Sequence, residues 1–216
     1  MRRKSFVYSA TKGISQAVFS LLYQIETTKE CPSPLDGPAI ILPKHQYWTD
    51  IPIISLVFEP VLYFVAKKEL FDYPFFRDYL LLLGGIPVDR EQTVRTLNSF
   101  RHLLSLLGAG EKVVIFPEGT YFREGVGSGK SRLIQMVLRS QSALERKIPF
   151  LPVGIRYGER VGWRRKVAVS VGPPLFAEAP SDAILFTQKI IEEISRLSQL
   201  PLLSSLFGVQ SSENSG

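Results

Sequence analysis

The chain is poor in the residues on which several protein classes depend. Its 216 residues include one cysteine, Cys31, together with two histidines and two tryptophans. A single cysteine excludes an internal disulfide and a metal site built from several cysteines, and it agrees with a reducing compartment. We therefore expect neither a disulfide framework nor a bound metal.

Long apolar runs are also lacking. No stretch reaches the ~18 consecutive apolar residues needed to span a bilayer. The longest candidate, residues 51–66, is interrupted by Pro52, Glu59 and Pro60. The basic first four residues are followed by no clear signal-peptide cleavage site, so we do not expect secretion.

The composition is that of one globular domain with a basic surface. Apolar residues make up 45% of the chain and charged residues 21%, with a formal net charge of +6. A positive balance suits an anionic partner, which could be a phospholipid surface, a nucleic acid or a phosphorylated substrate. Helix-turn-helix, zinc-finger and RNP signatures are all missing, so we expect no nucleic acid partner.

Residues 5–25 carry apolar side chains at helical spacing beside lysines and polar residues. Such a helix could cap the core or lie in a membrane interface, and the pattern does not choose between the two. Pro32, Pro34 and Gly37 predict that a loop, residues 27–37, ends this element. We expect an N-terminal amphipathic helical segment over residues 1–30 as a candidate membrane anchor, one domain over 31–200, and a tail over 201–216.

Strand-like and helix-like segments alternate through the rest of the chain. Strands are predicted at 39–42, 61–65, 85–88, 112–116, 150–155 and 167–171, and helices at 51–58, 75–83, 93–107, 131–144 and 182–197. This alternation predicts an α/β fold with a mostly parallel central sheet flanked by helices. Ligands of such sheets bind at the carboxyl ends of the strands.

A histidine and an aspartate follow the first predicted strand. His45 and Asp50 are five residues apart, which on one continuous helix would place them about 140° from each other. They can meet only in a turn, and Pro52 predicts that a helix begins near Asp50. The carboxylate would then orient one imidazole nitrogen and leave the other as a base, although such pairs also occur by chance.

Two more polar clusters follow predicted strands. Asp89-Arg90 comes after the third strand, and Pro117-Glu118-Gly119-Thr120 comes after the fourth. Carboxyl ends of parallel strands lie at one edge of a sheet, so we expect these clusters to share one site.

Four blocks together resemble the glycerolipid acyltransferase family, which includes the lysophosphatidic acid acyltransferases. They are His45-x-x-x-x-Asp50, Gly84 to Arg90, Phe116 to Thr120, and Leu151 to Gly154, in that order. The resemblance implies acyl transfer from a thioester, on coenzyme A or acyl carrier protein, to 1-acyl-glycerol-3-phosphate, forming phosphatidic acid without a cofactor. It also implies a peripheral enzyme at the cytoplasmic face of a membrane.

The resemblance implies roles for individual residues. His45, oriented by Asp50, would take the proton of the substrate hydroxyl. Arg90 would bind the phosphate. Glu118 and Thr120 would bind the glycerol part or organise the loop, and backbone N–H groups around Gly119 would stabilise the oxyanion.

One position departs from the family pattern. An arginine commonly follows the Glu-Gly-Thr block, and here the position is Tyr121. Either Arg123 substitutes for it, or the acceptor is a different lysophospholipid or a lyso-aminolipid. A hydrolase and a non-catalytic lipid-binding protein are the alternatives outside the transferase class.

Two further segments could meet anions. Residues 125–131 form a glycine-rich loop that lacks P-loop spacing because position 124 is glutamate, but Lys130 could bind an anionic acyl donor. Trp163 lies in a predicted basic turn between two strands, together with Arg160, Arg164, Arg165 and Lys166. This turn is either a solvated hairpin or a contact with a lipid surface.

Overall fold

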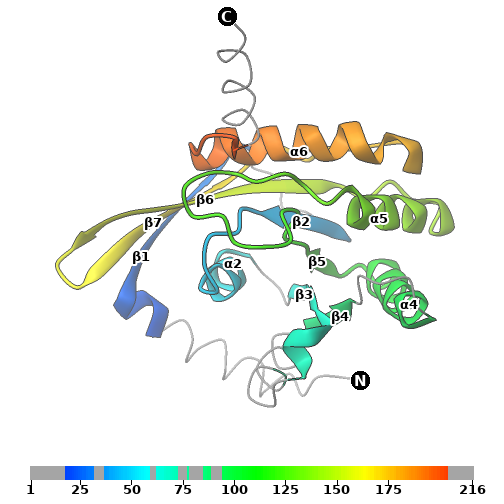
Figure 1. Ribbon diagram of the computed structural model, residues 1–216, viewed down its shortest axis with the longest axis horizontal. Helices are drawn as coiled ribbons and strands as arrows, with labels where there is room; N and C mark the ends of the chain where they lie inside the picture. Colours follow the sequence, from blue (N-terminus) through cyan, green and yellow to red (C-terminus); the bar gives the residue numbers. More distant parts are fainter. Residues whose placement is uncertain are drawn as a thin grey trace, which may run out of the picture.

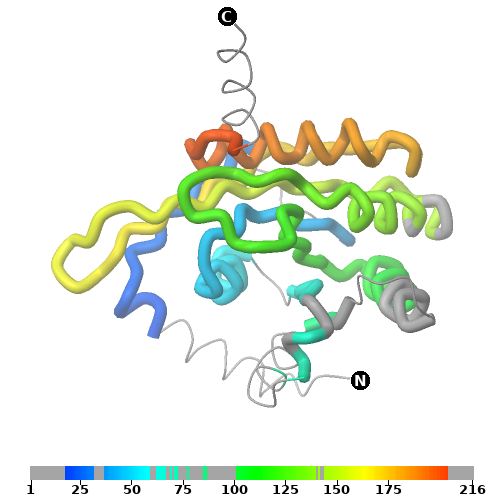
Figure 2. Tube along the Cα trace, in the orientation of Figure 1, coloured from blue at the N-terminus to red at the C-terminus, as the bar shows by residue number. Residues whose placement is uncertain are grey.

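The computed structural model describes residues 18–31, 37–58, 62–72, 77, 85–88 and 94–203 (Figures 1 and 2). A seven-stranded sheet with the order β1-β7-β6-β2-β5-β3-β4 forms its centre. The strands are β1 (Tyr23–Lys29), β2 (Ala39–Pro43), β3 (Leu62–Lys67), β4 (Gly85–Val88), β5 (Lys112–Val114), β6 (Phe150–Val161) and β7 (Arg164–Val171). All neighbouring strands are parallel except β6 and β7, which confirms the predicted sheet.

Helices cover both faces of the sheet (Figure 1). The helix α2 (Asp50–Val57) packs on one face, and α4 (Val94–Gly108), α5 (Ser131–Ala143) and α6 (Ala183–Ser198) pack on the other. Two short 3-10 helices, η1 (Lys68–Phe71) and η2 (Pro180–Asp182), complete the described elements. The helix predicted at 75–83 lies outside the described residues, apart from residue 77.

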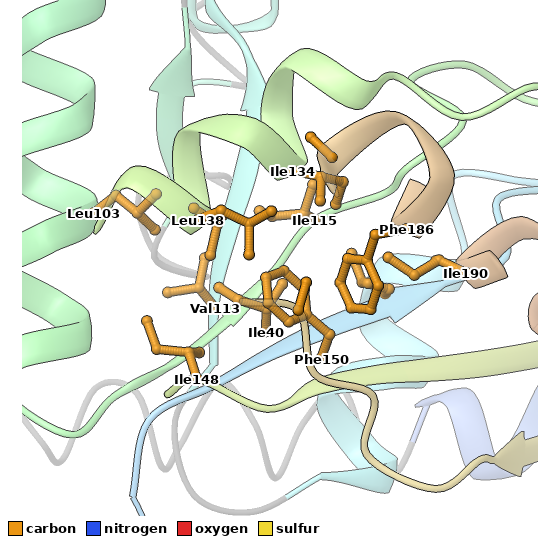
Figure 3. Packing of buried hydrophobic residues seen from close by; sticks show 14 of the residues in the cluster. Ile40, Leu103, Val113, Ile115, Ile134, Leu138, Ile148, Phe150, Phe186 and Ile190 are labelled. Carbon is orange, nitrogen blue, oxygen red and sulfur yellow. The ribbon is translucent and has the colours of Figure 1, made fainter. Parts of the chain in front are cut away.

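The central strand β2 is buried on both sides. Ile40 and Leu42 pack in the core cluster shared with α4, α5 and α6, part of which is shown in Figure 3. Ile41 packs in the cluster on the α2 face. Successive side chains of a strand point to opposite faces, so the continuous apolar run that predicted this strand fills two cores at once.

The N-terminal helix prediction is wrong from Tyr23 onward. Residues 18–22 are helical, but residues 23–29 form β1, which pairs in parallel with β7 at the edge of the sheet. Tyr23 and Ile25 pack against the core, whereas residues 26–29 are exposed, so the pairing with β7 rather than a buried face defines this segment as a strand. The predicted loop at 27–37 therefore begins later than expected, after Lys29. The predicted domain boundary at residue 30 would leave β1 outside the domain whose sheet contains it.

Parts of the remaining predictions lie outside the described residues. These parts are residues 1–17 of the N-terminal segment and residues 204–216 of the tail. Among the helices of the described part, none combines the length and the hydropathy required to cross a membrane.

The pair β6 and β7 is longer than predicted. β6 continues six residues beyond Ile155, to Val161, and β7 starts at Arg164. Their tip turns at Gly162, whose φ of +64° lies in the left-handed region. The resulting hairpin extends beyond the body of the protein (Figure 1) and confirms the predicted basic turn between two strands.

Candidate active site

The turn between β2 and α2 brings His45 and Asp50 together. Nδ1 of His45 lies 3.0 Å from Oδ2 of Asp50, as the sequence predicts. The Asp50 side chain is fully buried, while that of His45 retains 10% exposure. Asp50 is the first residue of α2, so the helix and the turn together fix the carboxylate.

The Asp50 carboxylate accepts hydrogen bonds at both oxygens. Oδ2 accepts from the backbone N–H groups of Gln46 and Tyr47, at 2.6 and 2.8 Å, and Oδ1 accepts from the hydroxyl of Tyr157 at 2.6 Å. An ionised carboxylate only accepts hydrogen bonds, so the contact with His45 requires Nδ1 to carry the hydrogen. Nε2 of the neutral imidazole then holds a lone pair and can act as a base.

Tyr157 was not found from the sequence. It reaches Asp50 because β6 continues beyond Val153, the residue that pairs with Pro43 at the end of β2. Its oxygen also lies 2.7 Å from Oγ1 of Thr49. Burial, together with the neighbouring carboxylate, raises the pKa of Tyr157 well above its ordinary value of 10.0, so the phenol stays protonated as a donor.

Two aromatic rings hold the imidazole of His45. The ring of Phe116 stacks on it at a centroid distance of 3.8 Å, and the ring of Tyr121 lies 4.2 Å away at a tilt of 50°. Tyr121 is half exposed, and burial raises the pKa of its phenol. The residue that replaces the family's arginine therefore contacts the predicted base directly.

A buried ion pair lies directly behind His45. Nζ of Lys44 donates to both oxygens of Glu118, at 2.9 and 3.0 Å, and to the carbonyls of His45 and Phe122. Neither side chain of the pair is exposed. Burial lowers the pKa of Lys44 and raises that of Glu118, although the attraction between them opposes both shifts.

Glu118 ties the third sequence block to the first. Besides the lysine, it accepts from the backbone N–H of His45 at 2.9 Å and from that of Gly127 at 2.8 Å. The N–H of Phe122 in turn donates to the carbonyl of His45 at 3.0 Å. Of the two roles predicted for Glu118, these contacts support the organisation of the loop, since both oxygens face donors of the protein.

The other residues of the third block lie near the same turn. The N–H of Gly119 donates to the carbonyl of Phe116, and its φ of +70° closes the turn. Thr120 and Arg123 are exposed. The guanidinium of Arg123 lies 5.2 Å from the centre of the ring of Tyr47, whose backbone N–H donates to Asp50.

Of the two remaining predicted binding residues, Lys130 is described and Arg90 is not. Lys130 is exposed at the start of α5, and its backbone N–H donates to the carbonyl of Pro117. Arg90 lies outside the described residues; β4, which precedes it, is the edge strand and lies three strands from β2. In the described part of the chain, no three His, Cys, Asp or Glu side chains group as ligands for a metal ion.

An imidazole oriented by a buried carboxylate, at the carboxyl ends of parallel strands, is typical of an enzyme that uses general acid–base catalysis. The model of the Acyltransferase family matches residues 24–156, so the chain belongs to this family, as the four blocks predicted. The fold and the predicted enzyme class are thereby confirmed together.

Named relatives agree with the family. A 1-acyl-sn-glycerol-3-phosphate acyltransferase of Pseudomonas aeruginosa is 31% identical over 172 residues, covering 76% of this chain and 63% of the relative. One of Bacillus subtilis with the same name is 28% identical over 210 residues, covering 90% of this chain and 100% of the relative. A lyso-ornithine lipid O-acyltransferase of Rhizobium meliloti is 31% identical over 118 residues, covering 55% of this chain and 38% of the relative.

A solved structure supports the fold. The crystal structure of PlsC, the 1-acyl-sn-glycerophosphate acyltransferase of Thermotoga maritima, matches with a TM-score of 0.65 at 24% sequence identity. The match covers 92% of this chain and 83% of the other.

Proposed function

We propose that this enzyme transfers an acyl group from a thioester to the free hydroxyl of 1-acyl-glycerol-3-phosphate and forms phosphatidic acid. The contact between His45 and Asp50 carries the proposal, because it leaves Nε2 of a neutral imidazole available to a substrate. The names of the Pseudomonas and Bacillus relatives supply the acceptor.

The reaction needs one base and no nucleophile from the enzyme. Nε2 of His45 takes the proton of the acceptor hydroxyl while its oxygen attacks the thioester carbonyl. The tetrahedral intermediate collapses by breaking the carbon–sulfur bond, and the protonated imidazole returns the proton to the leaving thiolate. Acyl-coenzyme A or acyl carrier protein serves as donor, and no cofactor takes part.

Binding of the two substrates is assigned to Thr120, Arg123 and Lys130, which are exposed, and to Arg90 on the strength of the family resemblance. Arg123 and Arg90 bind the acceptor phosphate, Thr120 contacts the glycerol part, and Lys130 binds the anionic donor. The N–H group of Gly119 already donates to Phe116, so the oxyanion donors proposed in this turn are those of Thr120 and Tyr121.

A lyso-ornithine lipid is the second candidate acceptor. Tyr121 occupies the position of an arginine in the family pattern, and its ring lies against His45. A head group without phosphate would require fewer cations at this position. Two relatives, from Rhizobium meliloti and Brucella abortus, are named lyso-ornithine lipid O-acyltransferase.

The substrates place the enzyme at a lipid surface. A monoacylated acceptor and an acyl donor both partition into lipid, so we propose that the protein acts peripherally at the cytoplasmic face of a membrane.

The test measures thioester-dependent acylation of lysophosphatidic acid by the wild type and by His45→Ala. Loss of a general base lowers the rate by a factor of about 10² to 10⁴. His102→Ala is the matched control, because the other histidine is exposed on α4. Full activity of His45→Ala would refute the assigned base.

The same assay separates the alternatives. Release of thiol without an acceptor would indicate a hydrolase, and lipid binding without turnover would indicate a binding protein. Mass spectrometry of the products formed with lysophosphatidic acid and with lyso-ornithine lipid identifies the acceptor.

A further inference from the structure

Two segments that the sequence offers as separate membrane contacts lie side by side. Trp163, at the tip of the β6–β7 hairpin, is 73% exposed. Its indole N–H donates to the carbonyl of Leu21, in the helical turn 18–22, at 3.1 Å. Leu21 is itself 61% exposed. Figure 1 shows this helical turn beside the protruding part of the hairpin, ahead of β1.

A third segment joins them from the candidate active site. Trp48 lies between His45 and Asp50 in sequence and is 59% exposed. Its ring meets the buried ring of Phe19 edge-on at 6.5 Å, and Phe19 belongs to the same helical turn as Leu21. These three segments contribute the exposed apolar residues that we call the interfacial patch: Val18, Leu21, Leu22, Trp48, Val161 and Trp163.

The hairpin adds basic residues beside the interfacial patch. Residues 156–166 contain five arginines and lysines and one acidic residue, Glu159. Arg160 and Lys166 are exposed, and the guanidinium of Arg165 lies over the rings of Tyr157 and Tyr47 at 5.2 and 5.8 Å. The basic side chains therefore extend from the hairpin to the turn that holds Asp50.

We propose that the interfacial patch and its cations dock the enzyme on an anionic bilayer, with the catalytic turn facing the lipid. Tryptophan prefers the boundary between acyl chains and head groups, and arginine and lysine bind anionic head groups while their stems cover apolar surface. Docking on the bilayer is independent of the proposed function. The orientation of the acceptor toward His45 rests on it.

The consequence is a lateral route for the acceptor. Trp48 belongs both to the patch and to the turn that carries His45 and Asp50, so the predicted base lies at the docked face. The acceptor's acyl chain remains in the bilayer while its hydroxyl reaches Nε2 of His45.

The experiment is co-sedimentation of the full chain with vesicles of phosphatidylglycerol and phosphatidylcholine. Leu21→Ser combined with Trp163→Ser is expected to weaken binding about tenfold or more. Ile184→Ser combined with Leu185→Ser is the matched control, because these two residues are similarly exposed, 71% and 75%, on α6. The control is expected to bind as the wild type does.

Charge is tested separately. Arg160→Ser and Lys166→Ser are each expected to weaken binding about fivefold at low salt, with a smaller effect at high salt. Lys189→Ser on α6 is the control for an exposed lysine elsewhere. Equal binding to pure phosphatidylcholine vesicles would overturn the proposal, and so would equal losses in the test and control variants.

An activity assay separates this proposal from the proposed function. The variant with Leu21→Ser and Trp163→Ser is expected to retain its rate on short-chain, water-soluble lysophosphatidate and to lose it on vesicles. A wild type that binds vesicles but acylates neither substrate would refute the proposed function alone. Analytical ultracentrifugation tests whether a second copy of the chain binds to the patch instead of a bilayer. If the wild type is a dimer and these substitutions convert it to a monomer, the patch is an interface between two copies and the proposal is overturned.

Discussion

The hydroxyl of Tyr157 donates to Oδ1 of Asp50 at 2.6 Å, while Oδ2 of the same carboxylate faces His45. Strand β6 thus supplies a hydrogen bond to one oxygen of the carboxylate, and the imidazole of His45 contacts the other oxygen. We assign Tyr157 a positioning role, since its hydroxyl contacts Asp50 and Thr49.

Tyr157→Phe is expected to lower kcat of the acylation reaction about tenfold to a hundredfold. A hydrogen bond to a charged group contributes about 1.5–3 kcal/mol, and its loss frees Asp50 to turn away from His45. KM for the acceptor should stay nearly constant, because the phenol hydroxyl is bonded to Asp50 and Thr49. Tyr23→Phe is the control, since Tyr23 packs edge-on against Tyr157. An unchanged kcat in Tyr157→Phe would contradict the positioning role.

Alkaline stability should report on the same phenol. The pKa of Tyr157 is raised above its ordinary value of 10.0, so above that pH the unfolded chain loses this proton while the folded chain keeps it. The stabilisation is fully present below pH ~10 and is lost as the pH rises further, by up to about 1.4 kcal/mol per pH unit. Urea unfolding should therefore show a steeper alkaline decline for the wild type than for Tyr157→Phe. Parallel declines would show that the phenol ionises freely in the folded protein.

The buried pair of Lys44 and Glu118 should behave as a unit. Lys44→Met leaves a buried carboxylate without its cation and is expected to cost about 3–5 kcal/mol of unfolding free energy. Glu118→Gln should cost a similar amount, because an amide cannot accept from Lys44, His45 and Gly127 together. The double variant should be more stable than the sum of the two losses predicts, as a double-mutant cycle in urea would measure. Simple additivity would show that the two side chains act independently.

Gly154 of the fourth sequence block is a packing residue. A Cβ at this position would lie 2.3 Å from the Leu197 carbonyl carbon and the Ser198 nitrogen, where the end of α6 crosses β6. Gly154→Ala is therefore expected to destabilise the fold by about 1–3 kcal/mol or more, since both contacts are backbone. Gly158→Ala on the same strand is the control, because its nearest neighbour would be 3.4 Å away. Similar unfolding midpoints for the two variants would contradict this explanation.

Local patterns were sufficient for most of the sheet. The apolar run of β2 and the helix start that Pro52 signals near Asp50 predicted the turn in which His45 meets Asp50, because both signals act over a few neighbouring residues. The same patterns failed at β1. Tyr23 and Ile25 suit a helical stripe as well as a strand face, and pairing with β7, from residue 164 onward, decided between them.

From β2 onward, the sequence alone determined the order of the described strands and main helices, the pair of His45 and Asp50, and the resemblance to the family. These follow from residue types at short spacing, and a turn or an apolar stripe requires no distant partner. Only the tertiary structure decided what holds that pair in place. Tyr157 is 107 residues from Asp50, and Glu118 is 74 from Lys44. Contacts across such separations depend on strand register and on how far β6 extends beyond β2, and no local pattern encodes either.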